Sequence, residues 1–303
     1  MSAKPPLFML VKQPELYELE HVGDLYDLRY KPAPGIAAAL VGGLGVDATM
    51  MDAMPDLRLI AIAGVGYDKT DVAYARAKGI AVTNTPDVLT DDVADLAIGL
   101  MIAVARRLPA QDLYVRQRRW VRDGLPPLTR RASGRKIGIL GLGRIGQAIA
   151  ARAEPFASEI GYFSRQPRSE GADYRYFDDV VSLAQWADTL IVAVSGGPAT
   201  AGLVDKKVIE ALGPDGILIN IARGSVVDEP ELVAALQDGR LGAAGLDVFA
   251  DEPNVPEALL GLDNVVLIPH QGSATVETRK AMADLALANL DAFFAGKPLI
   301  TPV

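Results

Sequence analysis

Three side chains that can handle protons or bind anions stand just beyond the ends of predicted strands. They are Arg223 after residues 217–221, Glu252 after 242–247 and His270 after 265–269. Because the carboxyl ends of parallel strands open onto the ligand crevice, we expect the three to converge there. An imidazole beside a carboxylate is favoured in its charged form and donates a proton near neutral pH. A guanidinium holds a carboxylate and a developing oxyanion in a planar fork. Together they suit the reduction of a carbonyl group next to a carboxylate.

A glycine loop predicts where the hydride donor for such a reduction binds. Strand 136–140 runs into a loop that opens a helical pattern, with the sequence Gly141-Leu142-Gly143-Arg144-Ile145-Gly146. The first glycine of this spacing allows a tight turn, the second lets main chain approach a pyrophosphate, and the third permits close packing of helix on strand. The helix N-terminus adds free N–H groups and the positive end of its dipole. We expect all six residues to bind a dinucleotide.

The next strand, 160–164, ends where the residue that contacts the ribose is expected, about 20 residues beyond the glycines. An NAD-binding protein carries Asp or Glu there. This chain has Ser164 and Arg165 instead, followed by Arg168. A hydroxyl and two guanidiniums attract a 2′-phosphate, which a carboxylate would repel. We therefore predict a preference for NADP(H), with NAD(H) also possible; a solvated basic loop is the alternative.

Short apolar runs alternate with helical patterns along the chain and fall into two series. The first comprises residues 7–11, 38–42, 57–63 and 80–84, and the second comprises 136–140, 160–164, 189–194, 217–221, 242–247 and 265–269. Continuous apolar strands separated by helices predict parallel sheets that are covered on both faces. The predicted fold class is therefore α/β, with two doubly wound parallel-sheet domains.

A long helix and an irregular segment join the two series. Residues 91–108 form one helical pattern, which we expect Pro109 to end. The arginine-rich stretch 111–135 contains Trp120 and is typical of an excursion outside the core. A last helical pattern, 276–294, follows the final strand.

Composition excludes several other classes of protein. The 303 residues include no Cys and only two His, His21 and His270, so thiolate and three-histidine metal sites are excluded and we expect no bound metal. The net charge of −8 has the wrong sign for a nucleic-acid partner. No apolar stretch approaches the roughly 20 residues of a membrane span, and the first residues lack a signal-peptide pattern. We expect a cytoplasmic protein with neither nucleic-acid nor membrane partners, in which His21 is structural.

Taken together, the motifs resemble those of the D-isomer-specific 2-hydroxyacid dehydrogenase family, in particular its glyoxylate and hydroxypyruvate reductase branch. The resemblance covers nearly the whole chain. Beyond the glycine loop it is carried by residues 63–68, 84–95, 221–224, 245–249 and 269–275.

The resemblance implies a particular domain organisation. A Rossmann NAD(P)-binding domain, residues 99–274, would be inserted into a flavodoxin-like substrate domain made of residues 1–98 and 275–303, with the active site in the cleft between them. Residues 99–135 would form a dimerisation arm, so the resemblance implies a homodimer.

The resemblance also implies residue roles. His270 would be the acid/base, Glu252 its carboxylate partner, and Arg223 the cation that orients the substrate. Main-chain N–H groups of Val65 and Gly66 would hold the substrate carboxylate.

On the cofactor side, Asp247 would contact the nicotinamide carboxamide and Ile221 would also bind the cofactor. The predicted function is NADPH-dependent reduction of small 2-oxo acids, with glyoxylate and hydroxypyruvate as the leading substrates. The alternatives are the same machinery acting on an arylpyruvate, a keto-gluconate or a phosphonate, or a non-catalytic dinucleotide sensor of the corepressor type. Trp120 is either an anchoring aromatic or a residue that reaches the partner's pocket.

Overall fold

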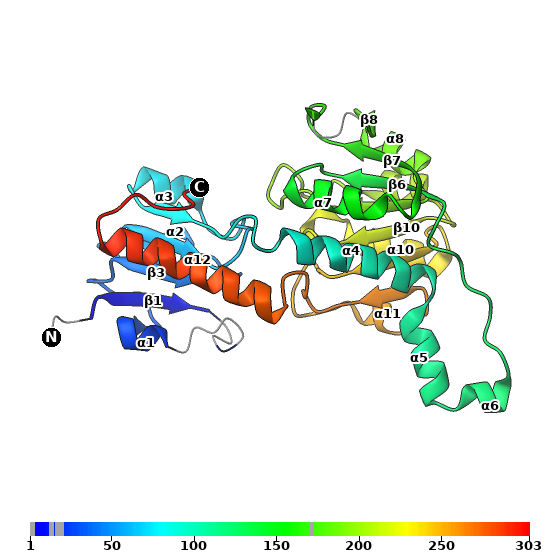
Figure 1. The fold of residues 1–303 in the computed structure, drawn as a ribbon, viewed down its shortest axis with the longest axis horizontal. Coiled ribbons are helices and arrows are strands. Elements are labelled where there is room, and N and C mark those ends of the chain that lie inside the picture. The colour runs from blue at the N-terminus through cyan, green and yellow to red at the C-terminus, as the bar shows by residue number, and fades with distance from the viewer. Residues whose placement is uncertain (1–3, 12–14, 16–20, 170–172) are drawn as a thin grey trace. The chain divides into compact units, whose positions relative to one another are not determined.

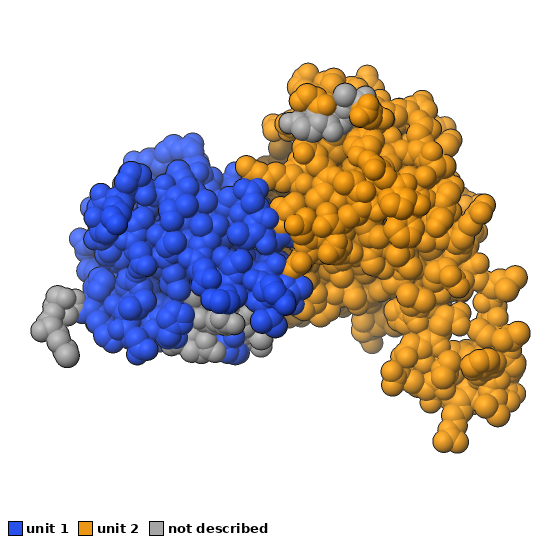
Figure 2. Space-filling model, viewed as in Figure 1, with its two compact units in different colours: residues 1–89, 273–303 blue, residues 90–272 orange. Residues whose placement is uncertain are grey.

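The computed structural model describes residues 4–11, 15, 21–169 and 173–303. The chain divides into two compact units: unit 1 is residues 1–89 and 273–303, and unit 2 is residues 90–272 (Figure 2). In each unit helices cover a parallel sheet (Figure 1). The predicted α/β class with two doubly wound domains is therefore confirmed, and the second unit is inserted between the two chain segments that build the first.

Unit 1 is built on a five-stranded parallel sheet. Its strands are β1 (Pro6–Leu10), β2 (Asp27–Arg29), β3 (Ala38–Val41), β4 (Leu59–Ile62) and β5 (Ala81–Thr83). Its helices are α1 (Val22–Leu25), α2 (Ala48–Asp52), α3 (Val72–Ala77) and α12 (Val276–Phe294). The strand order β2-β1-β3-β4-β5 is the flavodoxin-like order, as the sequence implied.

Successive side chains of the unit 1 strands fill two cores, one on each face of the sheet. Leu7 of β1 belongs to the core that α12 covers, together with Leu290. Phe8, the next residue, belongs to the opposite core, together with Met51 of α2. Because both faces are covered, the central strands β3 and β4 are apolar and buried at every position, which explains their continuous apolar runs in the sequence.

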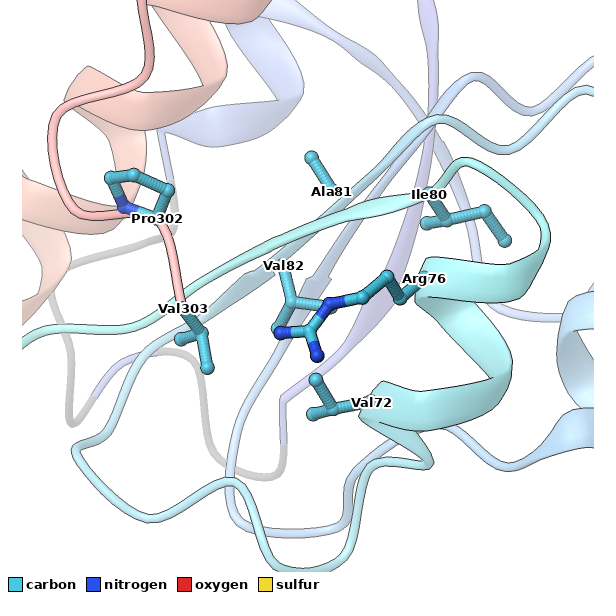
Figure 3. A pocket seen from close by; sticks show the side chains of 7 residues that line it. All are labelled: Val72, Arg76, Ile80, Ala81, Val82, Pro302 and Val303. Atoms are coloured by element: carbon cyan, nitrogen blue, oxygen red, sulfur yellow. The ribbon is translucent and has the colours of Figure 1, made fainter.

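After α12, the C-terminal residues return to the β5 edge of this sheet. Pro302 forms an antiparallel bridge with Thr83, and the Val303 N–H donates to Val82 O at 2.9 Å. A hollow of about 160 Å³ lies beside this contact. Figure 3 shows the residues that line it, which are Val72, Arg76, Ile80, Ala81, Val82, Pro302 and Val303. The returning segment thus pairs part of an edge strand that would otherwise present unpaired main-chain groups.

Thr85, just after β5, gives a test of this packing. It is fully buried, and its hydroxyl has no hydrogen-bond partner among the described residues. Leaving a buried hydroxyl unpaired costs about 1–3 kcal/mol. Thr85→Val, which keeps the shape, is therefore expected to raise the free energy of unfolding by ~1 kcal/mol in urea titrations. The matched control is Thr70→Val, expected to destabilise because Thr70 Oγ1 accepts the Val46 N–H at 3.2 Å. A lower midpoint for Thr85→Val would contradict this reasoning.

Unit 2 is built on a seven-stranded parallel sheet. Its strands are β6 (Arg135–Leu140), β7 (Ala157–Phe163), β8 (Arg175–Phe177), β9 (Thr189–Val192), β10 (Ile217–Asn220), β11 (Ala243–Leu246) and β12 (Val265–Leu267). The order is β12-β11-β10-β9-β6-β7-β8, so that the direction of winding reverses between β6 and β9. This is the dinucleotide-binding order with one further strand, β12.

The helices of unit 2 are α4 (Thr90–Ala105), α5 (Leu108–Arg116), α6 (Arg119–Asp123), α7 (Arg144–Ala153), α8 (Val180–Trp186), α9 (Lys206–Leu212), α10 (Glu229–Asp238) and α11 (Glu257–Leu260), with a 3₁₀ turn η3 (Gly224–Val226). All of them except α5 and α6 lie around the sheet (Figure 1). Arg152 of α7 pairs with Asp91 and Asp95 of α4, with N–O distances of 2.8 and 2.5 Å. Because α4 is tied to α7 from its first turn, the unit boundaries lie at 89/90 and 272/273 rather than at the predicted 98/99 and 274/275.

Pro109 does not end the long helix, contrary to the prediction. Helix α4 ends at Ala105, and Arg107 then adopts a left-handed conformation with φ 49°. Pro109 lies in the first turn of α5, where a missing N–H leaves no helical hydrogen bond unmade. Helices α5 and α6 project from the body of unit 2 as an arm, as expected for an excursion (Figure 1). Within the described ranges, no helix is long and apolar enough to cross a membrane.

Candidate active site and dinucleotide site

The glycine loop joins β6 to α7 at the point where the strand order reverses. Gly141 has φ 104°, and a Cβ there would lie 2.8 Å from Val194 Cγ1. A Cβ on Gly146 would lie 2.0 Å from Gly141 O, so α7 packs directly on the turn. At Gly143, by contrast, no atom of the described residues lies within 4 Å of the Cβ position. Crowding at the outer glycines and open space at the middle one fit a pyrophosphate held at the N-terminus of α7.

The predicted ribose-end residues lie in the loop that follows β7. Ser164 is 9% exposed and its Oγ donates to Gln166 O at 2.5 Å. Arg165 and Arg168 are exposed and line, with the two residues between them, a hollow of about 470 Å³. The buried Tyr162 hydroxyl accepts the Arg168 N–H at 3.0 Å and so ties this loop to the sheet. A basic hollow in this place suits a phosphate group.

His270 and Glu252 form a direct contact. His270 Nδ1 lies 2.8 Å from Glu252 Oε2, and Glu252 Oε1 accepts the Phe249 N–H at 3.1 Å. The Glu252 side chain is 25% exposed and the imidazole 45% exposed. The carboxylate therefore occupies Nδ1 and leaves Nε2 as the ring atom that can exchange a proton with a bound molecule.

The turn that carries His270 is held by a buried carboxylate. His270 has φ 54°, an uncommon conformation for a residue with a side chain, and its N–H donates to Asp247 O at 2.8 Å. The Asp247 side chain accepts the N–H groups of Gln271 at 2.5 Å and Gly272 at 2.9 Å. Burial raises the pKa of the Asp247 carboxyl, and these two donors partly offset the rise. Asp247 is 1% exposed; its contact with the nicotinamide stays a prediction.

Arg223 lies in a loop that packs against the Glu252 loop. The buried Asn220 at the end of β10 accepts the Ala222 N–H at 3.1 Å and donates to Arg223 O at 3.0 Å. A Cβ on Gly224 would lie 1.9 Å from Phe249 C, so the two loops touch main chain to main chain. The Arg223 guanidinium donates from Nη1 to Ala222 O at 2.7 Å.

Within unit 2, the structure brings several predicted residues together. Glu252 and His270 are in hydrogen-bond contact, and the loop of Arg223 packs on the loop of Glu252. Ile221, beside this loop, is 7% exposed, and its cofactor role stays a prediction. The glycine loop and the basic loop follow the carboxyl ends of β6 and β7, which are neighbouring parallel strands of the same sheet.

Val65 and Gly66 belong to unit 1, in the loop after β4. Both residues are half-buried, and neither of their N–H groups donates to any residue in the described part of the chain. Unpaired main-chain N–H groups of this kind can receive an anion. Their role toward a substrate carboxylate stays a prediction.

Sequence reasoning missed Asn220 and also Asn84, which holds the Val65 loop. Asn220 interrupts an otherwise apolar strand, Ile217–Asn220, and is 1% exposed. A buried polar side chain needs hydrogen-bond partners. An Asn at the end of an apolar strand, close to Arg223 in the sequence, could therefore have been predicted to hold the Arg223 loop.

These features together define a class of protein. A doubly wound sheet in dinucleotide-binding order carries a glycine turn at its reversal point, and a His–Glu pair with a nearby Arg follows other strands of the same sheet. This combination is that of an NAD(P)-dependent oxidoreductase.

Comparison with known proteins leads to the family. Residues 98–272 match the family described as D-isomer specific 2-hydroxyacid dehydrogenase, NAD binding domain. Hydroxyphenylpyruvate reductase of Plectranthus scutellarioides is 56% identical over 267 residues, which are 88% of this chain and 85% of that protein. The 2-ketogluconate reductase of Gluconobacter oxydans is 45% identical over all of both chains.

A solved structure is similar over the whole chain. It is an NADPH-dependent glyoxylate/hydroxypyruvate reductase from Sinorhizobium meliloti in complex with NADP and malonate, 46% identical, with a TM-score of 0.94 over 99% of this chain and 97% of that one. The protein described here belongs to the D-isomer specific 2-hydroxyacid dehydrogenase family. The predicted family and enzyme class are confirmed.

Proposed function

We propose that this protein uses NADPH to reduce small 2-oxo acids, with glyoxylate and hydroxypyruvate as the first substrates to test. The observation that carries the proposal is the His270–Glu252 contact of 2.8 Å, together with the packing of the Glu252 loop against the Arg223 loop. The Sinorhizobium meliloti relative is named for these two substrates, whereas the other two relatives are named for hydroxyphenylpyruvate and 2-ketogluconate. Aryl and sugar-acid substrates are therefore the nearest alternatives.

In this proposal, named residues of the protein donate the proton, stabilise the developing charge and bind the substrate carboxylate. His270 Nε2 donates a proton to the carbonyl oxygen, and Glu252 stabilises the charged imidazole before the donation. The Arg223 guanidinium binds the carboxylate and the oxygen on which negative charge develops. The N–H groups of Val65 and Gly66 also bind the carboxylate. When bound, the reduced nicotinamide supplies the hydride.

We assign the cofactor to the loop of residues 141–146 and the basic loop. The N-terminus of α7 and the open face of Gly143 would hold the pyrophosphate. Arg165 and Arg168, with Ser164, would bind the 2′-phosphate that distinguishes NADPH from NADH.

The test is an assay of reduced-nicotinamide oxidation with glyoxylate, hydroxypyruvate, phenylpyruvate and 2-ketogluconate, each with NADPH and with NADH. We expect turnover with the first two acids and a higher kcat/KM with NADPH. No turnover with any 2-oxo acid, in protein that still binds NADPH, would reject the proposal and favour a dinucleotide sensor.

The cofactor preference can be changed at one position. Arg165→Asp is expected to lower the ratio of kcat/KM for NADPH to that for NADH by about 10- to 100-fold, because a charge-assisted bond worth about 1.5–3 kcal/mol is replaced by repulsion. The dissociation constant of 2′,5′-ADP should rise in parallel. Lys207→Asp, on the exposed surface of α9, makes the same change of net charge and should leave both quantities unaltered. An unchanged cofactor ratio in Arg165→Asp would refute the phosphate assignment.

We also propose that the arm is covered by a second copy of the chain. Its large apolar side chains are strongly exposed in the single chain, with Val121 at 94%, Leu125 at 81%, Leu128 at 99% and Trp120 at 58%. Such a concentration of apolar surface is typical of an interface rather than of free surface. Light scattering is expected to give twice the mass of one chain for the parent and a lower mass for Val121→Asp/Leu128→Asp. Leu260→Asp, at 64% exposure on α11, is the matched control. A parent of single-chain mass would contradict the proposal.

A further inference from the structure

The loop after β4 is held by the strand end next to it. Asn84, directly after β5, donates from Nδ2 to Val65 O at 2.9 Å. The following residue, Thr85, donates its N–H to Gly64 O at 2.9 Å. Two successive carbonyl groups of the loop are therefore bound by two successive residues of another segment.

Fixing these carbonyl groups also fixes two N–H groups. A trans peptide unit is planar, and its N–H points opposite to its C=O. The Thr85 N–H holds Gly64 O and so directs the N–H of Val65 away from Thr85. The Asn84 amide holds Val65 O and so directs the N–H of Gly66 away from Asn84. These are the two N–H groups that donate to no residue in the described part of the chain.

Asn84 is in turn held by polar contacts that lead to α12. Thr301 Oγ1 donates to Asn84 O at 2.6 Å and accepts from Asn289 Nδ2 at 2.9 Å. Asn289, with 0% exposure, also accepts the N–H groups of Ile300 at 3.0 Å and Thr301 at 3.2 Å. A buried and fully connected set of this kind makes the position of Asn84 well defined.

We propose that Asn84 is a positioning residue for substrate binding, because its amide, by holding Val65 O, presents the N–H of Gly66 to the substrate carboxylate beside the N–H of Val65. The inference rests on the proposed function, which assigns the carboxylate to those N–H groups. Asn84 acts only through the main chain and does not itself touch the substrate. A neutral amide is suited to this task, since Ala offers no donor and Asp replaces the donor by a negative charge near an anion site.

The experiment compares Asn84→Ala and Asn84→Asp with the parent. For Asn84→Ala we expect the KM for glyoxylate to rise about five- to tenfold, as for the loss of one hydrogen bond, with kcat within twofold. For Asn84→Asp we expect a larger rise, which should diminish as salt is added. The dissociation constant of NADPH should stay unchanged in both variants.

The matched control is Asn264→Ala. Asn264 Nδ2 also bridges main-chain carbonyls, those of Leu236 at 3.4 Å and Gly242 at 3.1 Å, but in unit 2. It should leave the KM for glyoxylate unchanged. If Asn84→Ala does not fold, Thr301→Val, which removes the hydroxyl donor to Asn84 O, should raise the KM in the same direction by a smaller factor.

The outcomes separate the inference from the function on which it rests. An active parent with an unchanged KM in the Asn84 variants would overturn the positioning role alone. An equal loss of kcat in Asn84→Ala and Asn264→Ala would do the same, because it would indicate a general structural effect. A parent inactive on every 2-oxo acid would overturn the proposed function and the inference with it.

Discussion

Replacement of His270 by Asn is expected to lower kcat for 2-oxo acid reduction by about 10²- to 10⁴-fold, the usual contribution of a general acid. His270 holds its ring against Glu252 at 2.8 Å, and Asn has no group that can transfer a proton at neutral pH. Asn rather than Ala is the informative substitution, because the backbone at this position has φ 54°, a conformation that Asn tolerates. Steady-state kinetics at saturating NADPH measures the effect.

The chain provides its own control for this experiment. His21, the only other histidine, is exposed at the start of α1. His21→Asn should retain the parental kcat, and NADPH should bind both variants as it binds the parent. A His270→Asn protein that keeps its rate within a few-fold would remove His270 from the chemistry.

Arg223→Lys is expected to lower kcat/KM for glyoxylate by about 10²- to 10³-fold, through both a higher KM and a lower kcat. The substitution keeps the positive charge but removes the planar fork that can bind a carboxylate and an adjacent oxygen together. Because Asn220 and Gly224 fix the main chain on either side, the shorter reach of the ammonium is not compensated by movement of the loop. The same assay measures this loss.

Arg58→Lys is the corresponding control. Arg58 also donates from Nη1 to main-chain carbonyls, those of Pro55 at 3.1 Å and Leu57 at 2.7 Å, but it precedes β4 instead of following a strand. Its replacement should leave kcat/KM within twofold of the parent. Equal effects of the two substitutions would show that Arg223 has no special part in turnover.

Most strands were predictable because their burial on both faces makes them continuously apolar. The exceptions are β2 (Asp27–Arg29) and β8 (Arg175–Phe177), which the sequence analysis did not identify. Each has three residues, lies at a sheet edge and includes exposed polar side chains. Their strand conformation comes from pairing with β1 and β7, which short and mixed sequences do not reveal.

Some residues of the candidate site could likewise be predicted from the sequence, and others could not. Arg223, Glu252 and His270 follow predicted strands, and their side chains together suit one reaction, so the sequence was enough to propose them as site residues. Asn84 could not be selected from the sequence. Asn84 donates to the main-chain oxygen of Val65, which follows a different strand. Any residue type at position 65 would offer that oxygen, so the sequence does not indicate the contact. The role of Asp247 in holding the His270 turn was hidden for the same reason.

The insertion of unit 2 has a consequence for biosynthesis. The segment 90–272 is continuous and leaves the ribosome before α12 does, so unit 2 can complete its folding first. Until residues 273–303 emerge, the sheet face formed by Leu7, Leu40 and Leu59 lacks the helix that covers it. The nascent N-terminal sheet therefore keeps an apolar face exposed until residues 273–303 have emerged, and a chaperone would find the most apolar surface to bind at that stage.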